Sequence, residues 1–94
     1  MSLDPTQSRA ARGLLDWSQT QLAQASNLSE STIRDFEKGR RVPSINNLAA
    51  IRQALERAGV EFISENGGGA GVRIAKRPDQ DGTRPENLNA SNDD

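Results

Sequence analysis

Residues 17–44 read WSQTQLAQASNLSESTIRDFEKGRRVPS and contain two helix signals in close succession. The first opens with Ser18-Gln-Thr-Gln21, in which the Ser18 and Gln21 side chains can satisfy each other's exposed amides as a capping box. The second starts with Ser29 as its N-cap and ends at Gly39, the usual left-handed stop. The stretch therefore predicts two short helices separated by very few residues.

The connection between these helices is Ser26-Asn27-Leu28, since the first helix is expected to end at about Ser26. Two short helices on a turn of three or four residues form a helix-turn-helix. Asn27 stands where the turn needs a left-handed residue, and asparagine tolerates that conformation better than any residue except glycine. Ala23 is small where the two helices must approach closely. The apolar side that would lock the pair together consists of Leu28, Ile33 and Phe36.

Further helices are predicted on both sides of this pair. An earlier helix is expected from Thr6, taken as its cap, to about Leu15. A later helix has Ser44 as its cap, carries apolar residues at helical spacing, and closes at Gly59. The pattern then changes to short β-rich runs at residues 60–64 and 72–76, which predict a hairpin with Val60, Phe62, Val72 and Ile74 on one face. The glycine-rich residues 67–71 favour a loop over a phosphate cradle, because they precede a strand and lack the P-loop lysine.

Charge is divided unevenly along the chain. The net charge of all 94 residues is −1, yet residues 1–77 hold eleven Lys/Arg and eight Asp/Glu, a net of +3. Residues 78–94 hold one Arg and five acids, a net of −4, with no aromatic or β-branched aliphatic residue. We therefore predict a disordered acidic tail over residues 78–94 and a mildly basic folded part.

Several functional classes are disfavoured by what the sequence lacks. It has no cysteine and no histidine, so it offers neither a disulfide framework nor a thiolate metal site, and we expect no metal and no cofactor. No pair of carboxylates stands in a recognisable catalytic pattern, so we expect no catalytic residue and no enzyme activity. No apolar run approaches the ~20 residues of a membrane span. A reducing cytoplasm fits the absence of cysteine.

The motif of residues 17–44 resembles the phage repressor/Cro type of helix-turn-helix, the xenobiotic-response-element family of bacterial regulators. The resemblance covers residues 8–58. It rests on Ser18, Gln19, Leu22, Ala23, Asn27, Ser29, Ser31, Thr32, Ile33, Phe36, Glu37, Gly39, Arg40, Pro43 and Ser44. The chain departs from the family pattern at Ser26, where an apolar residue is usual, and at Glu30, where many members carry a base-reading Arg or Gln. A hairpin also replaces the usual fifth helix.

The resemblance implies a mainly α fold, a lambda-repressor-like helix-turn-helix bundle of four helices, to which the strand pattern adds a C-terminal β-hairpin. Residues 1–59 would be the DNA-binding domain. Residues 60–77 would be a hairpin used for dimerisation, because an isolated two-stranded hairpin is marginal in water and a second copy would cover its open edges and Ile63. The implied function is a small bacterial or phage-type transcriptional regulator, of the repressor kind. It would bind double-stranded DNA at a palindromic operator as a homodimer. The alternative is an antitoxin-like or adaptor protein whose main partner is another protein.

The second helix of the motif, residues 29–38, is the expected reading helix. At about 100° per residue, Ile33 and Phe36 fall on one side with Glu37 beside them. The opposite side holds Ser31, Arg34, Asp35 and Lys38, with Glu30 at the N-terminal tip. The resemblance implies that Glu37 pairs with Arg12 of the first helix as a structural contact.

Base reading and phosphate binding are assigned to different residues. Ser31 and Arg34 are predicted to read bases, since Arg to guanine is the commonest specific contact. Glu30 and Asp35 could each accept a hydrogen bond from cytosine or remain solvated, and the sequence leaves both open. Gln19 is expected to hold a phosphate, and Lys38, Arg40 and Arg41 to displace counterions. The full predicted DNA-binding set is Ser18, Gln19, Ser29, Glu30, Ser31, Arg34, Asp35, Lys38, Arg40 and Arg41.

Overall fold

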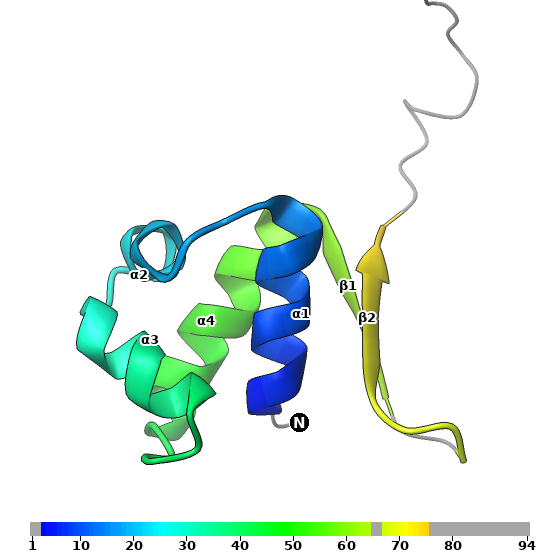
Figure 1. The fold of residues 1–94 in the computed structure, drawn as a ribbon. Helices are drawn as coiled ribbons and strands as arrows, with labels where there is room; N and C mark the ends of the chain where they lie inside the picture. The colour runs from blue at the N-terminus through cyan, green and yellow to red at the C-terminus, as the bar shows by residue number, and fades with distance from the viewer. Residues whose placement is uncertain (1–2, 65–66, 76–94) are drawn as a thin grey trace, which may run out of the picture.

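The computed structural model describes residues 3–64 and 67–75 and contains four helices followed by a two-stranded hairpin (Figure 1). The elements are α1 (Pro5–Leu15), α2 (Gln19–Ser26), α3 (Glu30–Glu37), α4 (Ile45–Arg57), β1 (Val60–Ile63) and β2 (Gly71–Ile74). The predicted bundle with a C-terminal hairpin is confirmed. The predicted disordered tail, residues 78–94, lies outside the described residues.

The helix starts follow the capping chemistry of the sequence, with one correction. Ser18 and Gln21 form the expected capping box at α2, and Ser29 caps α3. The cap of α1 is Asp4 and not Thr6, which was the wrong prediction. The Asp4 carboxylate accepts hydrogen bonds from the Thr6 amide at 2.7 Å and the Thr6 hydroxyl at 2.6 Å, so Thr6 lies inside the first turn. A carboxylate satisfies two donors here where the Thr6 hydroxyl would satisfy one.

The core lies where the helices meet. Its buried apolar side chains come from the N-terminal segment, all four helices and the first strand: Leu3, Ala11, Leu22, Ala23, Ile33, Phe36, Ile51, Ala54, Leu55 and Val60. Trp17, which precedes the cap of α2, packs partly buried against this cluster, as expected for a residue at the N′ position.

The hairpin packs beside α1, on the side away from α2 and α3 (Figure 1). Its antiparallel register pairs Val60 with Ile74 and Phe62 with Val72, so these four side chains share a face as predicted. Val60 is buried, whereas its cross-strand partner Ile74, at the same end of the hairpin, is 49 % exposed. β1 ends at Ile63, one residue short of the predicted run 60–64, whereas β2 begins at Gly71, one residue before the predicted run 72–76, and ends at Ile74. Residue 76 of the predicted run lies outside the described residues.

Candidate nucleic-acid interface

The turn between α2 and α3 has the geometry that the sequence predicts. Asn27 adopts φ 60° and ψ 40°, in the left-handed region, and the Leu28 amide donates to the Ala23 carbonyl at 2.9 Å. Ser26 stands at a buried position, and its hydroxyl donates to the Leu22 carbonyl at 2.7 Å. The polar residue at this apolar site is thus satisfied within its own helix, so it leaves no unpaired group between α2 and the core.

α3 is locked to the protein along one side and open along the other. Ile33, Phe36 and Glu37 are buried at 0, 3 and 2 % exposure. On the opposite side Glu30, Ser31 and Lys38 are exposed, while Arg34 and Asp35 are half-buried. The faces are those expected from the helical period, and the open side holds residues able to donate to and accept from base edges.

Glu37 is the hub that fixes α3 to α1 and α2. Its carboxylate accepts from Arg12 Nη2 at 2.7 Å and Arg12 Nε at 2.9 Å. The hydroxyl of Ser8, a fully buried residue, donates to it at 2.6 Å, and Gln19 Nε2 donates at 3.1 Å. The expected Arg12–Glu37 contact is present, and Ser8 and Gln19 complete the shell of donors around the buried charge. A buried carboxylate is tolerated only with such a set of partners.

The pKa of Glu37 reflects two opposed influences. Burial raises it, but hydrogen bonds from Arg12, Ser8 and Gln19 together with the positive charge of Arg12 outweigh the burial. The pKa therefore lies below the ordinary value of 4.5, and Glu37 is ionised at neutral pH.

The structure gives Gln19 a role that the sequence did not predict. Its side-chain amide is directed inward to Glu37, whereas a phosphate contact was expected. Gln19 is the first residue of α2, so its backbone amide remains among those that no helical carbonyl satisfies. Any phosphate at this end of α2 would meet backbone amides rather than the inward-turned side chain. The predicted DNA-binding residues Ser18 and Ser29 act as helix caps, since their hydroxyls accept hydrogen bonds from the backbone amides of Gln21 and Thr32.

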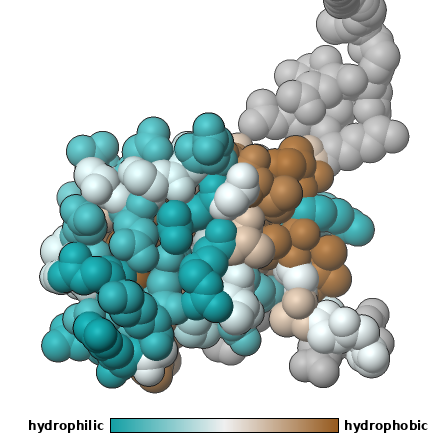
Figure 2. Space-filling model, in the orientation of Figure 1, coloured by the Kyte–Doolittle hydropathy of each residue, from teal (hydrophilic) through white to brown (hydrophobic). Residues whose placement is uncertain are grey.

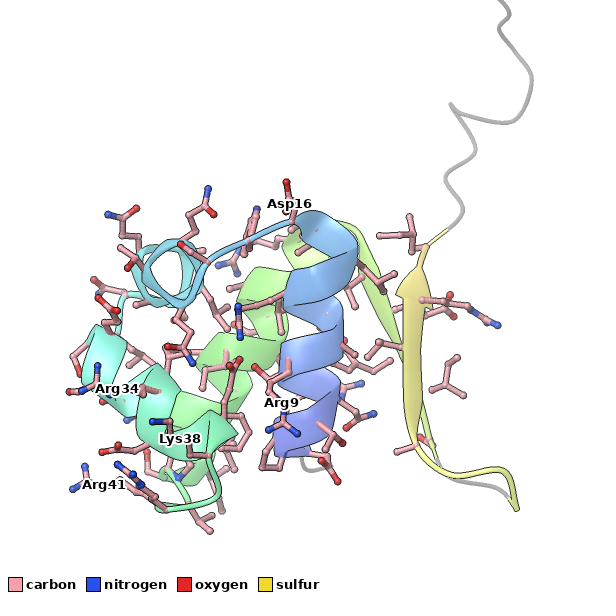
Figure 3. The ribbon with its side chains drawn as sticks, in the orientation of Figure 1. Arg9, Asp16, Arg34, Lys38 and Arg41 are labelled. Atoms are coloured by element: carbon pink, nitrogen blue, oxygen red, sulfur yellow. The ribbon has the colours of Figure 1, made fainter. Side chains whose placement is uncertain are left out.

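Free cations gather at the C-terminal end of α3. Arg34 lies on α3, Lys38 is its C-cap, and Arg40 and Arg41 belong to the loop that follows. Figure 3 labels Arg34, Lys38 and Arg41 of this group. Within the part of the chain that the structure describes, none of these four forms an ion pair with a carboxylate. Unpaired surface cations keep their full charge and their own counterions, which a polyanion can displace.

A fifth cation, Arg9 of α1, was missed by the sequence analysis. Its Nη1 donates to the backbone carbonyl of Glu37, the last residue of α3. Figure 3 shows Arg9 at the same end of the molecule as Lys38 and Arg41, with Asp16 at the opposite end of α1. No local pattern marks this contact, because it depends on how α1 crosses the end of α3.

The surface around α2 and α3 is hydrophilic, and the apolar residues on this face of the molecule gather beside the hairpin (Figure 2). Among residues 3–64 and 67–75 no group of three potential metal ligands occurs. The same residues contain no helix long and apolar enough to cross a membrane.

Comparison with known proteins decides the family. The family model described as helix-turn-helix matches residues 9–62, more than half of the chain. The chain belongs to the Cro/C1-type helix-turn-helix family. Members of this xenobiotic-response-element family are DNA-binding transcription regulators, and that function applies to the chain. A search of curated proteins finds no match to it.

The matched region contains the motif, α4, and most of α1 and β1. It begins at Arg9 and ends at Phe62, so Arg12, Asn27 and Glu37 all lie within it. The helix-turn-helix is therefore α2 and α3, and the exposed side of α3 is the candidate interface with DNA.

Proposed function

We propose that the protein is a sequence-specific regulator that reads double-stranded DNA by placing α3 in the major groove. The observation that carries this proposal is the contrast between the two sides of α3. One side is held by the buried Ile33, Phe36 and Glu37, and the other presents Arg34 and Lys38 without a carboxylate partner in the described part of the chain. A rigid helix with an open polar side is what major-groove reading requires.

Sequence would be read from the N-terminal half of α3. Arg34 can donate to O6 and N7 of a guanine, and Ser31, one turn earlier, is exposed and can contact a neighbouring base. Glu30 and Asp35 are carboxylates on the same open side, able to accept from the N4 amine of cytosine. Their negative charge would disfavour other bases, so they would tune selectivity without supplying affinity.

Affinity would come from contacts to the phosphates of the two DNA strands that border the major groove. In this docking, the backbone amides of the first turn of α2, at Gln19, would contact the phosphates of one strand. The side chains of Lys38, Arg40 and Arg41 would contact those of the other strand. Such contacts fix the register on the duplex and make the binding constant fall with salt. We propose that the protein acts as a cytoplasmic repressor, which would block transcription by occupying a promoter through this surface.

We further propose that two copies associate through the hairpin. Both outer edges of a two-stranded sheet are open, and an isolated hairpin is marginal in water. Leu14 on α1 and Ile74 on β2 are 45 and 49 % exposed, and apolar surface gathers over this part of the molecule (Figure 2). A second copy would cover both the edges and the apolar surface. It would also pair two recognition helices for half-sites about 34 Å apart.

The dimer is tested by light scattering on the full chain and on Ile74→Glu. We expect a dimer for the parent and a monomer for the variant, because a buried carboxylate would oppose association. Ile45→Glu is the matched control, since Ile45 is also exposed, at 84 %, but lies at the start of α4. A parent that remains monomeric at tens of micromolar, or a control that dissociates equally, would contradict the assignment.

The DNA-reading function is tested by selecting bound sequences from a random duplex pool and measuring affinity against salt concentration. The expected result is a shared palindrome with two half-sites and a steep loss of affinity with salt. If the protein retains all sequences of the random pool equally well, sequence-specific reading is refuted. Absence of DNA binding, together with stable capture of a partner protein in nuclease-treated lysate, would favour the antitoxin-like or adaptor alternative.

A further inference from the structure

Arg9 connects two helices that are distant in the sequence. It belongs to α1 and is exposed, yet its guanidinium reaches the end of α3 and donates to the carbonyl of Glu37. The last carbonyls of a helix have no partner within the helix, so this contact satisfies one of them. The C-terminal end of α3 also carries partial negative charge, which favours a cation there.

The contact to Glu37 uses only one nitrogen of the guanidinium. An arginine side chain offers five N–H donors and keeps its charge at all accessible pH values. Within the described residues, no carboxylate oxygen forms an ion pair with Arg9. Hydrogen bonds from the Thr6 hydroxyl and amide are the main cause of the lowered pKa of Asp4, and the positive charge of Arg9 adds a smaller contribution, so the Asp4 carboxylate is directed to Thr6 and not to Arg9. Most of the donors and the charge of Arg9 therefore remain available to an anion.

Arg9 lies at the end of α3 that would approach the phosphates beside the major groove. Lys38 follows Glu37 directly, so Arg9 and Lys38 lie at the same end of α3, as Figure 3 shows together with Arg41. When the N-terminal residues of a recognition helix contact bases, its far end approaches the phosphates of the flanking strand. An arginine already held at one nitrogen loses less side-chain freedom when it binds a phosphate than a free lysine does.

We propose that Arg9 is a phosphate-binding residue of the DNA interface, so that α1 contributes directly to DNA binding. With Lys38, Arg40 and Arg41 it forms a four-cation cluster drawn from α1, the C-cap of α3 and the following loop. The cluster contacts the sugar–phosphate backbone and carries no base preference. This inference rests on the proposed DNA-reading function and names an additional residue of its surface.

The experiment compares Arg9→Gln, Arg9→Lys and the parent on the selected site and on a random duplex, across a salt series. We expect Arg9→Gln to weaken both duplexes by a similar factor, roughly 3- to 10-fold. The slope of log affinity against log salt should fall by about 0.9 per protomer, the value for one lost phosphate contact. Arg9→Lys should restore most of the slope, because it restores the charge.

Arg57→Gln is the matched control for the charge change. Arg57 is exposed at the end of α4, about 18 Å along the helix axis from its first residue. We expect its salt slope to equal that of the parent. Thermal melting of each variant separates loss of folding from loss of contact, and Gln retains a donor for the Glu37 carbonyl.

The outcomes separate this inference from the function on which it rests. If the parent binds DNA with a steep salt slope but Arg9→Gln keeps that slope, Arg9 is only a cap on α3 and the inference is overturned. An equal loss of slope in Arg57→Gln would overturn it too, since the effect would then be one of net charge. If the parent fails to bind DNA, the proposed function fails first, and Arg9 has no DNA role.

Discussion

Replacing Glu37 by Gln removes one negative charge from the hub of the fold while keeping its shape. In the parent, one carboxylate oxygen accepts from Ser8 and Arg12 Nε, and the other accepts from Arg12 Nη2 and Gln19. A glutamine has an NH₂ group in place of one oxygen. Whichever way it is turned, that NH₂ group faces an Arg12 N–H, so one hydrogen bond is replaced by two opposed donors.

The size of the effect follows from the burial of the two partners. The Glu37 side chain is 1 % exposed and the Arg12 side chain 19 %. Breaking a fully buried pair by removing one charge costs about 3–5 kcal/mol. Because Arg12 keeps some access to water, we expect about 2–4 kcal/mol for Glu37→Gln. A domain of this size is stable by only about 4–10 kcal/mol, so the variant should lose between about a fifth and all of its stability.

The assay is urea and thermal unfolding followed by tryptophan fluorescence. Trp17 is the only tryptophan, is half-buried against the core, and accepts from Arg12 Nη1 through its carbonyl at 3.0 Å. It therefore reports on the region where the substitution acts. The melting temperature should fall by roughly 10–30 °C, at about 4–8 °C for each kcal/mol.

Glu56→Gln makes the same chemical change in an exposed pair. Glu56 bonds Arg52 at 3.0 Å one helical turn away, with side chains 44 and 20 % exposed. Exposed pairs of this spacing contribute about 0.3–0.5 kcal/mol. If Glu37→Gln unfolds within about 0.5 kcal/mol of Glu56→Gln, the buried network does not stabilise the bundle and the reasoning is wrong.

Three further results are expected. The folded pKa of Glu37 is lowered, so the unfolded chain takes up this proton first and the stabilisation, complete above about pH 5, is lost as the pH falls through the folded pKa. Unfolding free energies from pH 6 to 3 should therefore decline more steeply for the parent than for Glu37→Gln. Arg34→Ala should relax the preference at one base pair of each half-site, with a loss of about 1–3 kcal/mol of binding free energy for the preferred sequence. Lys38→Ala should instead weaken binding to all duplexes alike. The reverse pattern in binding selections would mean that another side of α3 faces the DNA. Gln7→Ala should destabilise by about 0.5–1.5 kcal/mol more than Gln21→Ala, because both lose a capping box but only Gln7 also donates to the Gly71 carbonyl of the hairpin, at 3.1 Å. Equal unfolding curves for the two would show that this hairpin contact contributes nothing.

Most of the fold could be predicted from the sequence because its boundaries depend on neighbouring residues. The caps at Ser18, Ser29 and Ser44 act on amides two or three positions away, and the turn needs a left-handed residue at Asn27. Each of these is a short-range rule that tertiary packing then reinforces. The buried side of α3 follows from helical period in the same way.

Of the details that the sequence analysis did not predict, the cap of α1 is local, and the others depend on tertiary geometry. Asp4 is selected over Thr6 by neighbouring residues, because Gln7 completes a capping box with it and Pro5 occupies the first turn of the helix. The Gln19 side chain turns inward because the buried Glu37 carboxylate of α3 lies beside it. Arg9 donates to the backbone carbonyl of Glu37, which has no partner within α3. No window of sequence that covers one helix contains the partner in the next.

The acidity of the whole chain does not oppose DNA binding, because the charges are separated in space. The Glu37 carboxylate is buried and paired with Arg12 within the bundle, so it does not repel DNA phosphates at the surface. Glu61 pairs with Arg73 on the hairpin, and Glu56 pairs with Arg52 on α4. The acids left on the open side of α3 are Glu30 and Asp35, which stand among free cations. Local charge, and not the net charge of the sequence, governs counterion release at the interface.

α1 connects the two surfaces on which the proposed mechanism depends. On one side Ser8 and Arg12 hold Glu37 of α3, and on another Gln7 holds the hairpin at Gly71. Since α1 has 11 residues and a length of about 16 Å, it acts as a short rigid connector between them. A dimer formed through the hairpin would therefore set the separation of its recognition helices through partly or fully buried hydrogen bonds rather than through a flexible linker. An operator whose half-sites are moved by one base pair would have to strain those bonds, and it would be bound more weakly even though every base contact within each half-site is unchanged.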